Sequence, residues 1–206
     1  RRAEPLRVLL RHDHGHRERA AAADQRVDVQ ERFRPHIAGW EPMVTHVDAL
    51  IRGCRALAVP VIVTEQYPQG LGPTIPELAE ALEGVDPIEK RAFSSLGAPE
   101  TVAQLEQYGR DQVVVCGIEA HVCVQQSVAD ILRSGREAHV ALDAIASRTA
   151  SSREIGVRRM RAAGMAPSGV ELALFEMMQS ADHPAFKEVS GLVRDLPRSF
   201  AGEPVA

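Results

Sequence analysis

Apolar residues in this chain form short continuous runs that alternate with stretches of three-and-four spacing. Continuous runs at residues 59–64 and 112–116 are typical of strands buried on both faces of a parallel sheet. Shorter strands are predicted at 138–142 and 165–168. The segments predicted to be helical are residues 43–57, 77–82, 98–108, 124–134, 151–163, 171–179 and 184–194.

Strands of about five residues that alternate with longer helices predict an α/β fold. We expect a single doubly wound domain over residues 27–195, with helices on both faces of the sheet. Residues 1–26 are predicted to be a basic N-terminal arm, and residues 196–206 a C-terminal tail. In such folds, ligands bind beyond the carboxyl ends of the strands. The helix at 151–163 is predicted to begin at an N-cap formed by Ser151 or Ser152.

Composition narrows the function classes. The 206 residues carry a formal net charge of −4, which argues against nucleic acid as the main partner. The sequence contains no apolar run of about 18 residues, so no membrane span is predicted. The three cysteines, Cys54, Cys116 and Cys123, form no CxxC pair, which favours a cytoplasmic protein without a disulfide framework.

Three residues are candidates for chemistry. Cys123 follows Gly117 by six residues at the start of a predicted helix, where the free N–H groups favour a thiolate, although a buried core cysteine fits the pattern equally well. Lys90 is one of only two lysines beside 22 arginines, which suggests a need for an ammonium point charge. The other lysine, Lys187, is expected on the surface. Asp28 alone is a weak signal, because an Asp before a helix is usually a cap.

Together these residues belong to a known pattern. The segments DVQERF (28–33), EK (89–90) before FS (93–94), and GIEAHVCV (117–124) resemble the isochorismatase-like cysteine hydrolase superfamily, which includes nicotinamidases and carbamoylsarcosine amidases. The segments VIVTEQYP (61–68) and GLGPT (70–74) resemble its isochorismatase domain-containing branch. The resemblance extends over residues 27–195.

The resemblance implies a six-stranded parallel sheet of order 3-2-1-4-5-6 and a homo-oligomer, either a dimer or a tetramer. It implies a catalytic triad of Asp28, Lys90 and Cys123, in which Lys90 favours the thiolate of Cys123. It also implies a cis peptide bond between Ile118 and Glu119. An oxyanion hole is expected from the backbone N–H of Cys123 and that of Glu119 or Ala120. The candidate walls of the substrate pocket are Phe33, Tyr67, Phe93 and His121.

The expected function is metal-independent hydrolysis of a small amide or related carbonyl substrate through a Cys123 thioester, without a cofactor. Nicotinamidases carry an Asp-x-His metal motif where this chain reads TEQY (64–67), so no catalytic metal is predicted. Three alternatives stay open. They are vinyl ether hydrolysis of the isochorismate type, an inactive small-molecule-binding or interaction protein on the same fold, and a redox-sensing thiol that would need Cys116 as its partner.

The segment before Asp28 fits the pattern poorly. A central strand should be almost entirely apolar, yet residues 20–27 include Asp24 and Arg26. One alternative is that residues 6–10 supply this strand and that Asp13 replaces Asp28. Another is that residues 1–26 are not the natural start of the domain, which would leave it poorly stable or inactive.

Overall fold

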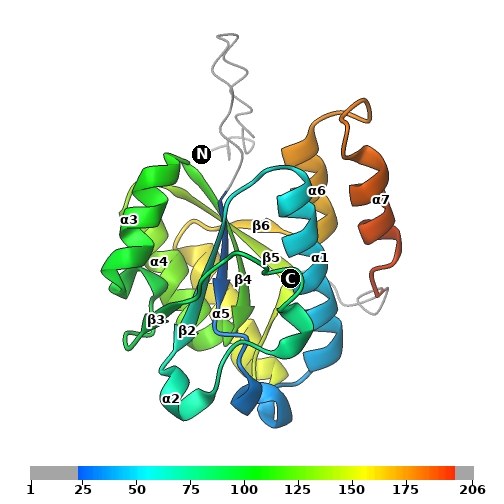
Figure 1. Ribbon diagram of the computed structural model, residues 1–206. Coiled ribbons are helices and arrows are strands. Elements are labelled where there is room, and N and C mark those ends of the chain that lie inside the picture. The colour runs from blue at the N-terminus through cyan, green and yellow to red at the C-terminus, as the bar shows by residue number, and fades with distance from the viewer. Residues whose placement is uncertain (1–22, 198–206) are drawn as a thin grey trace, which may run out of the picture.

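Six strands form one sheet in which every neighbouring pair is parallel (Figure 1). The computed structural model describes residues 23–197. The strand order is β3-β2-β1-β4-β5-β6, the order that the family resemblance implies. The strands are β1 (Ala23–Val27), β2 (Val61–Gln66), β3 (Ile88–Lys90), β4 (Gln112–Ile118), β5 (Glu137–Ala146) and β6 (Ala166–Ser168).

Helices cover both faces of the sheet, so β2 and β4 are buried, although β2 ends in the polar residues Thr64, Glu65 and Gln66. All six residues of β2 are buried, as are all residues of β4 after Gln112. Gly117 was expected to end this strand, but β4 continues to Ile118. The φ of Gly117 is +110°, and the pairing of β4 with β5 shifts its register between Val115 and Gly117. A glycine tolerates this conformation, so the strand passes through the irregularity rather than ending at it.

The central position of the sheet belongs to β1, which lies between β2 and β4. Its last residue, Val27, is in register with Thr64 on one side and Gly117 on the other. The strand begins at Ala23, four residues inside the predicted arm. Asp28 therefore follows the central strand directly. The alternative that used residues 6–10 and Asp13 concerns positions outside the described residues.

The described segment contains seven helices, and all except the short α2 cover the sheet in two layers (Figure 1). The seven are α1 (Trp40–Ala56), α2 (Pro68–Leu71), α3 (Pro99–Tyr108), α4 (Gln125–Arg133), α5 (Ala150–Ala162), α6 (Val170–Met178) and α7 (Phe186–Arg194). One face is covered by α1, α6 and α7, and the other by α3, α4 and α5. Two apolar clusters fill these layers. Cys54 and Cys116 lie in the first cluster and Cys123 in the second, so the sheet separates Cys116 from Cys123.

Two local predictions were wrong. The N-cap of α5 is Thr149 rather than Ser151 or Ser152, and its Oγ1 accepts a hydrogen bond of 3.1 Å from the backbone N–H of Ser152. The predicted helix at 77–82 is a short 3₁₀ turn, Pro76–Leu78, followed by further turns. Both differences are local and leave the topology unchanged.

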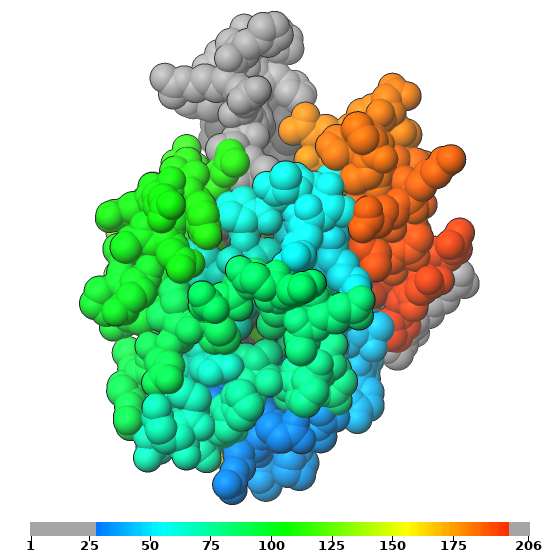
Figure 2. Space-filling model, viewed as in Figure 1, coloured from blue at the N-terminus to red at the C-terminus, as the bar shows by residue number. Residues whose placement is uncertain are grey.

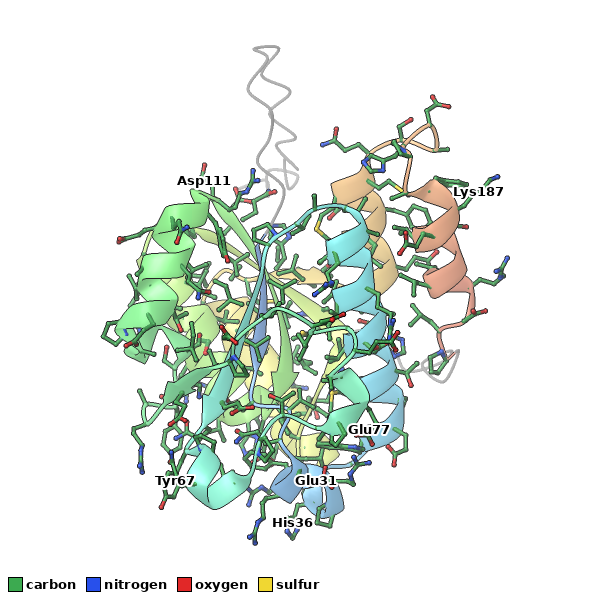
Figure 3. All side chains as sticks on the ribbon, in the orientation of Figure 1. Glu31, His36, Tyr67, Glu77, Asp111 and Lys187 are labelled. Atoms are coloured by element: carbon green, nitrogen blue, oxygen red, sulfur yellow. The ribbon has the colours of Figure 1, made fainter. Side chains whose placement is uncertain are left out.

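The carboxyl ends of the strands gather at one end of the molecule. Figure 3 shows Glu31, His36 and Tyr67, which follow β1 and β2, at this end, whereas Asp111, just before β4, lies at the other. The segment between β2 and β3 crosses the face seen in Figure 2. In the described part of the chain, no helix is long and apolar enough to cross a membrane.

Candidate active site

Asp28 stands at the carboxyl end of the central strand and points into a closed cluster. Its backbone is left-handed, with a φ of +56°, and its N–H donates to the carbonyl oxygen of Thr64 at 3.2 Å. Asp is among the residues that tolerate this conformation. Only 1 % of Asp28 is exposed. Its Oδ1 accepts a hydrogen bond from Thr64 Oγ1 at 3.2 Å and its Oδ2 one from Lys90 Nζ at 2.7 Å.

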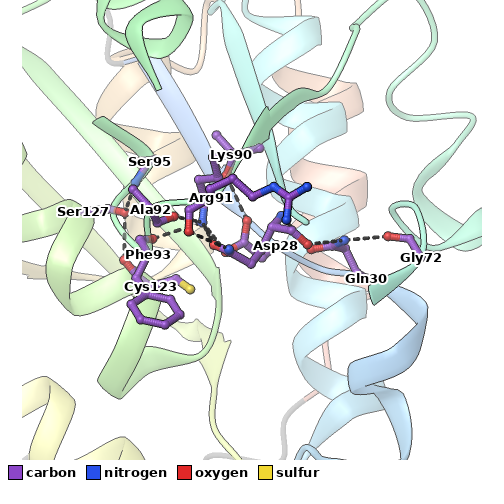
Figure 4. Close-up of polar contacts among 12 residues, drawn as sticks. Asp28, Gln30, Gly72, Lys90, Arg91, Ala92, Phe93, Ser95, Cys123 and Ser127 are labelled. Atoms are coloured by element: carbon purple, nitrogen blue, oxygen red, sulfur yellow. Dashed lines mark hydrogen bonds and ion pairs between the residues drawn. The ribbon is translucent and has the colours of Figure 1, made fainter. Parts of the chain in front are cut away.

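Lys90, the last residue of β3, has a fully buried side chain. Besides Asp28, its Nζ contacts Gln66 Oε1 at 2.9 Å and the carbonyl oxygens of Ala92 and Phe93 at 3.3 and 3.0 Å (Figure 4). These four partners are all acceptors, and an ammonium group has only donors to offer. The surroundings therefore suit a charged lysine, whose one carboxylate partner in this set is Asp28.

Cys123 reaches the same cluster from the opposite side. It lies in a single π-helical turn, Ala120–Val124, between β4 and α4. Its thiol is hydrogen-bonded to Asp28, and only 5 % of the residue is exposed. The peptide bond between Ile118 and Glu119, just before this turn, is cis. Asp28 thus contacts both Lys90 and Cys123. The three residues come from distant parts of the chain.

Burial changes the acid–base behaviour of the site. It raises the pKa of the Cys123 thiol far above the usual value near 9.0, and the carboxylate of Asp28 raises it further, while Lys90 opposes both. Burial also raises the pKa of Asp28 above its usual value of 3.8, again opposed by Lys90. Lys90 thus favours the thiolate, as expected, but desolvation of the buried thiol outweighs this one nearby cation. The hydrogen bond to Asp28 also favours the protonated thiol.

A second ion pair lies at the start of the π-helical turn Ala120–Val124, which we call the nucleophile turn because Cys123 is the candidate nucleophile. The carboxylate of Glu119, which is 4 % exposed, accepts hydrogen bonds from Arg148 Nε at 3.0 Å and Nη2 at 2.7 Å, and also from the backbone N–H of Arg148. Although burial alone would raise the pKa of Glu119, these bonds lower it below its usual value. The pair ties Glu119, directly after β4, to Arg148, the second residue after β5.

Two positioning residues escaped the sequence analysis. Ser127 Oγ donates to the carbonyl oxygen of Cys123 at 2.7 Å and accepts from the backbone N–H of Ser95 at 2.9 Å. Gly156 of α5 lies against the turn so closely that a Cβ there would meet the carbonyl oxygen of Ala120 at 2.6 Å and Cα of His121 at 2.8 Å. Neither role has a local signal, because both depend on segments that meet only in the fold.

Two glutamines that the sequence analysis also missed, Gln30 and Gln66, hold the strand ends together. The side chain of Gln30 accepts from the backbone N–H of Gln66 at 2.8 Å and donates to the carbonyl oxygen of Gln66 at 3.1 Å and to that of Gly72 at 2.5 Å. The side chain of Gln66 donates to the carbonyl oxygen of Arg91 at 2.9 Å and accepts from Lys90. Lys90 is thus held by two hydrogen bonds, one to Asp28 after β1 and one to Gln66 of β2.

The four predicted wall residues lie in different settings. Phe33 packs against the first apolar cluster. Phe93 is 53 % exposed, and Tyr67 is 41 % exposed beneath the guanidinium of Arg91, which lies 3.9 Å from its ring centroid. His121 contacts Ser147 Oγ at 3.1 Å. It also lines a polar cavity of about 470 Å³ with residues of α4 and α5, beside the turn rather than within the Asp28 cluster.

The described residues include no group of three or more His, Cys, Asp or Glu side chains that could hold a metal ion. Glu65, in the segment TEQY (64–67) that stands at the place of the metal motif, is 7 % exposed. Its Oε1 accepts a hydrogen bond of 2.6 Å from the backbone N–H of Thr74. This carboxylate therefore fixes the loop after β2.

Residues 26–171 match the family model described as the isochorismatase domain. The chain belongs to the isochorismatase family. It is 40 % identical to isochorismatase domain-containing protein 2 of Danio rerio over 167 residues, which is 81 % of this chain and 83 % of the relative. The matched segment contains Asp28, Lys90 and Cys123, so the cluster lies within the isochorismatase domain.

Solved structures agree with this assignment. A MAR1 ribonuclease from Caenorhabditis elegans has 36 % sequence identity and a TM-score of 0.84, over 91 % of this chain and 97 % of that one. The YcaC gene product of Escherichia coli, described as an octameric hydrolase of unknown specificity, has the same fold. It has a TM-score of 0.74 at 19 % identity, over 87 % of this chain and 96 % of that one. The protein thus has the fold of the isochorismatase-family hydrolases.

Proposed function

We propose that this protein is a metal-independent cysteine hydrolase that cleaves a small amide through a thioester on Cys123. The observation that carries the proposal is the position of Asp28, whose carboxylate contacts Lys90 Nζ at 2.7 Å and the thiol of Cys123. A nucleophile, a proton acceptor and a cation that stabilises the acceptor are the groups that thiol-dependent acyl transfer requires.

In the first step, the sulfur of Cys123 attacks the amide carbonyl carbon while its proton passes to Asp28. The raised pKa of Asp28 suits a proton acceptor, and Lys90 balances the negative charge of the buried Asp28 carboxylate before the proton is transferred. The carbonyl oxygen becomes an oxyanion, for which we assign the backbone N–H groups of Cys123 and of Glu119 or Ala120. The N–H groups of Val122 and Val124 already donate to the carbonyl oxygen of Glu119.

In the second step, the C–N bond breaks and Asp28 returns the proton to the departing nitrogen, which leaves as ammonia or an amine. A water molecule then attacks the thioester carbon and gives one proton to Asp28. When the C–S bond breaks, this proton returns to the sulfur, and the products are a carboxylic acid and the free thiol. The cycle consumes one amide and one water and leaves Cys123 and Asp28 unchanged.

The closed geometry favours a small substrate. Asp28, Lys90 and Cys123 are 1 %, 3 % and 5 % exposed, so the reacting carbonyl must enter a site with little open surface. The relative named as a ribonuclease makes RNA a second substrate to test. A polynucleotide backbone would have to displace the loops around Cys123, and for this reason we favour the small amide.

The test compares the wild-type protein with Cys123→Ala on a panel of small primary amides, with ammonia release as the measurement. We expect Cys123→Ala to abolish release, and an acyl adduct on Cys123 of the wild-type protein to appear by mass spectrometry. Cys54→Ala is the control, because Cys54 is buried in the cluster on the other face of the sheet. Amide hydrolysis that survives in Cys123→Ala would refute the covalent route.

The same pair of proteins separates the alternatives. Isochorismate cleavage that persists in Cys123→Ala would favour vinyl ether hydrolysis, and RNA cleavage that Cys123→Ala abolishes would favour a thiol-dependent ribonuclease. Binding of small amides without turnover would favour the inactive binding protein. We also propose that the protein is a homo-oligomer, as described for the Escherichia coli relative, which light scattering after size-exclusion chromatography would test.

A further inference from the structure

The segment after Lys90 connects the ammonium group of Lys90 with the turn that carries Cys123. Lys90 Nζ donates to the carbonyl oxygen of Phe93 at 3.0 Å. Two residues later, the backbone N–H of Ser95 donates to Ser127 Oγ at 2.9 Å, and this hydroxyl donates to the carbonyl oxygen of Cys123 at 2.7 Å (Figure 4). Ser94 is the residue between these two anchors. Ser94 therefore lies between Phe93, which is bound by the ammonium group of Lys90, and Ser95, which is linked through Ser127 to the nucleophile turn.

The side chain of Ser94 has no structural task of the usual kind. The residue is 7 % exposed, and within the described residues its buried hydroxyl has no hydrogen-bond partner. Ser94 is the N-cap of the 3₁₀ turn Ser95–Gly97, where a serine hydroxyl normally accepts a backbone N–H, but no such bond is made. The backbone closes the turn instead, through a bond of 3.1 Å from the N–H of Gly97 to the carbonyl oxygen of Ser94.

A buried hydroxyl without a partner destabilises the folded chain, so its presence calls for an explanation such as a ligand. We propose that Ser94 is a substrate-binding residue whose hydroxyl accepts a hydrogen bond from the amide N–H of the substrate. This inference rests on the proposed amide hydrolysis and identifies the feature that the site recognises. The carbonyl oxygen of the substrate is directed to the backbone N–H groups of the nucleophile turn. The amide nitrogen is then left in need of an acceptor, and the hydroxyl of Ser94 supplies it.

Two thiol reagents, one with and one without this N–H group, test the assignment. Iodoacetamide carries an amide, and methyl iodoacetate has an ester oxygen in place of the amide nitrogen. Alkylation of Cys123 by each reagent is followed by mass spectrometry in the wild-type protein and in Ser94→Ala. We expect Ser94→Ala to lower the rate with iodoacetamide about tenfold, the typical loss of one hydrogen bond, and to leave the rate with methyl iodoacetate unchanged.

Thermal stability provides an independent readout. Because Ser94→Ala removes an unpaired buried hydroxyl, we expect Tm to stay the same or to rise by about 2–4 °C. Thr101→Val is the matched control. Thr101, in α3, is fully buried, and its Oγ1 also lacks a partner within the described residues. Its replacement should change Tm in the same direction and leave both alkylation rates unchanged.

The outcomes separate this inference from the proposed function. An unchanged ratio of the two rates in Ser94→Ala, with Cys123 still labelled, would overturn the role of Ser94 and leave the cysteine hydrolase intact. A fall in Tm together with equal losses of both rates would assign Ser94 a structural role instead. Failure of both reagents to label Cys123 in the wild-type protein, together with the absence of an acyl adduct from every amide of the panel, would overturn the nucleophile, and the Ser94 assignment with it.

Discussion

Lys90 Nζ lies 2.7 Å from Asp28 Oδ2, and neither side chain is exposed to solvent. Charges removed from water in this way each pay a desolvation penalty, which the partner charge and the hydrogen bonds around the pair offset together. The pair therefore links stability to chemistry. The cation that balances the proposed proton acceptor is also the group that permits a carboxylate at the centre of the sheet.

Replacing one partner tests this dependence. Lys90→Met leaves the carboxylate of Asp28 buried without a counter-ion, so we expect the free energy of unfolding to fall by about 3–5 kcal/mol. Chemical denaturation measures the loss. The double variant Asp28→Asn with Lys90→Met should recover part of it. The control is Arg133→Met, which breaks an exposed pair with Asp130 on α4 and should cost no more than about 0.5 kcal/mol. Similar losses in the two single variants would contradict the argument.

Gly156→Ala tests the close packing of α5 on the nucleophile turn. The added methyl group would overlap backbone atoms of Ala120 and His121, which cannot rotate away. We expect a destabilisation of about 1–3 kcal/mol and slower alkylation of Cys123. Gly191→Ala in α7 is the matched control, since the nearest atom to its Cβ would be a guanidinium nitrogen of Arg194 at 3.9 Å. That variant should be neutral or more stable by about 0.5–1 kcal/mol. Equal effects of the two substitutions would show that the turn adjusts freely.

Ser127→Ala removes a hydroxyl that joins two segments of the site. The backbone N–H of Ser95 loses its acceptor and the carbonyl oxygen of Cys123 loses a donor, so we expect a loss of stability of about 1–3 kcal/mol and slower alkylation of Cys123. Ser134→Ala is the comparison. Its hydroxyl also donates to a carbonyl oxygen within the helical region, that of Ile131 at 2.7 Å, but far from Cys123. Retention of full Cys123 reactivity in Ser127→Ala would argue against a positioning role.

The raised pKa of Cys123 predicts a specific loss of stability at alkaline pH. The thiol ionises near pH 9.0 in the unfolded chain but resists ionisation in the folded protein, so the unfolded state releases its proton first. The stability due to this group is fully present below about pH 9 and falls above it, by about 1.4 kcal/mol per pH unit. Between pH 8 and 10, the wild-type protein should therefore lose more stability than Cys123→Ala in denaturant titrations. Parallel curves for the two proteins would show that burial does not suppress ionisation.

The sequence predicted the layers of the fold because the buried strands and the helices differ in their apolar spacing. Two features were not predicted from that spacing. The strand β3 is only three residues long, too short for a periodic signal, and β1 contains Asp24 and Arg26 in a central position. The family resemblance, rather than periodicity, directed attention to Asp28.

The site was predicted in part, and the missing part was three-dimensional. Asp28, Lys90 and Cys123 were named from motifs, and the structure brings them together. The supporting groups, Ser127 and Gly156, could not be found in this way, because Ser127 meets Ser95, 32 residues earlier in the chain, and Gly156 meets Ala120, 36 residues earlier, only after folding. The raised pKa of the Cys123 thiol could not be predicted for a related reason, since burial is a property of the packed site and not of the residue type.

Gln30 carries a further consequence for how the site is kept in shape. Its carboxamide offers one acceptor and one donor to the main chain of Gln66, as a neighbouring peptide group would. The side chain is thus a surrogate peptide that continues the ladder between β1 and β2 after the first strand has turned away at Asp28. A glutamate of nearly the same shape could not replace it, since its second oxygen would face two carbonyl groups and repel both.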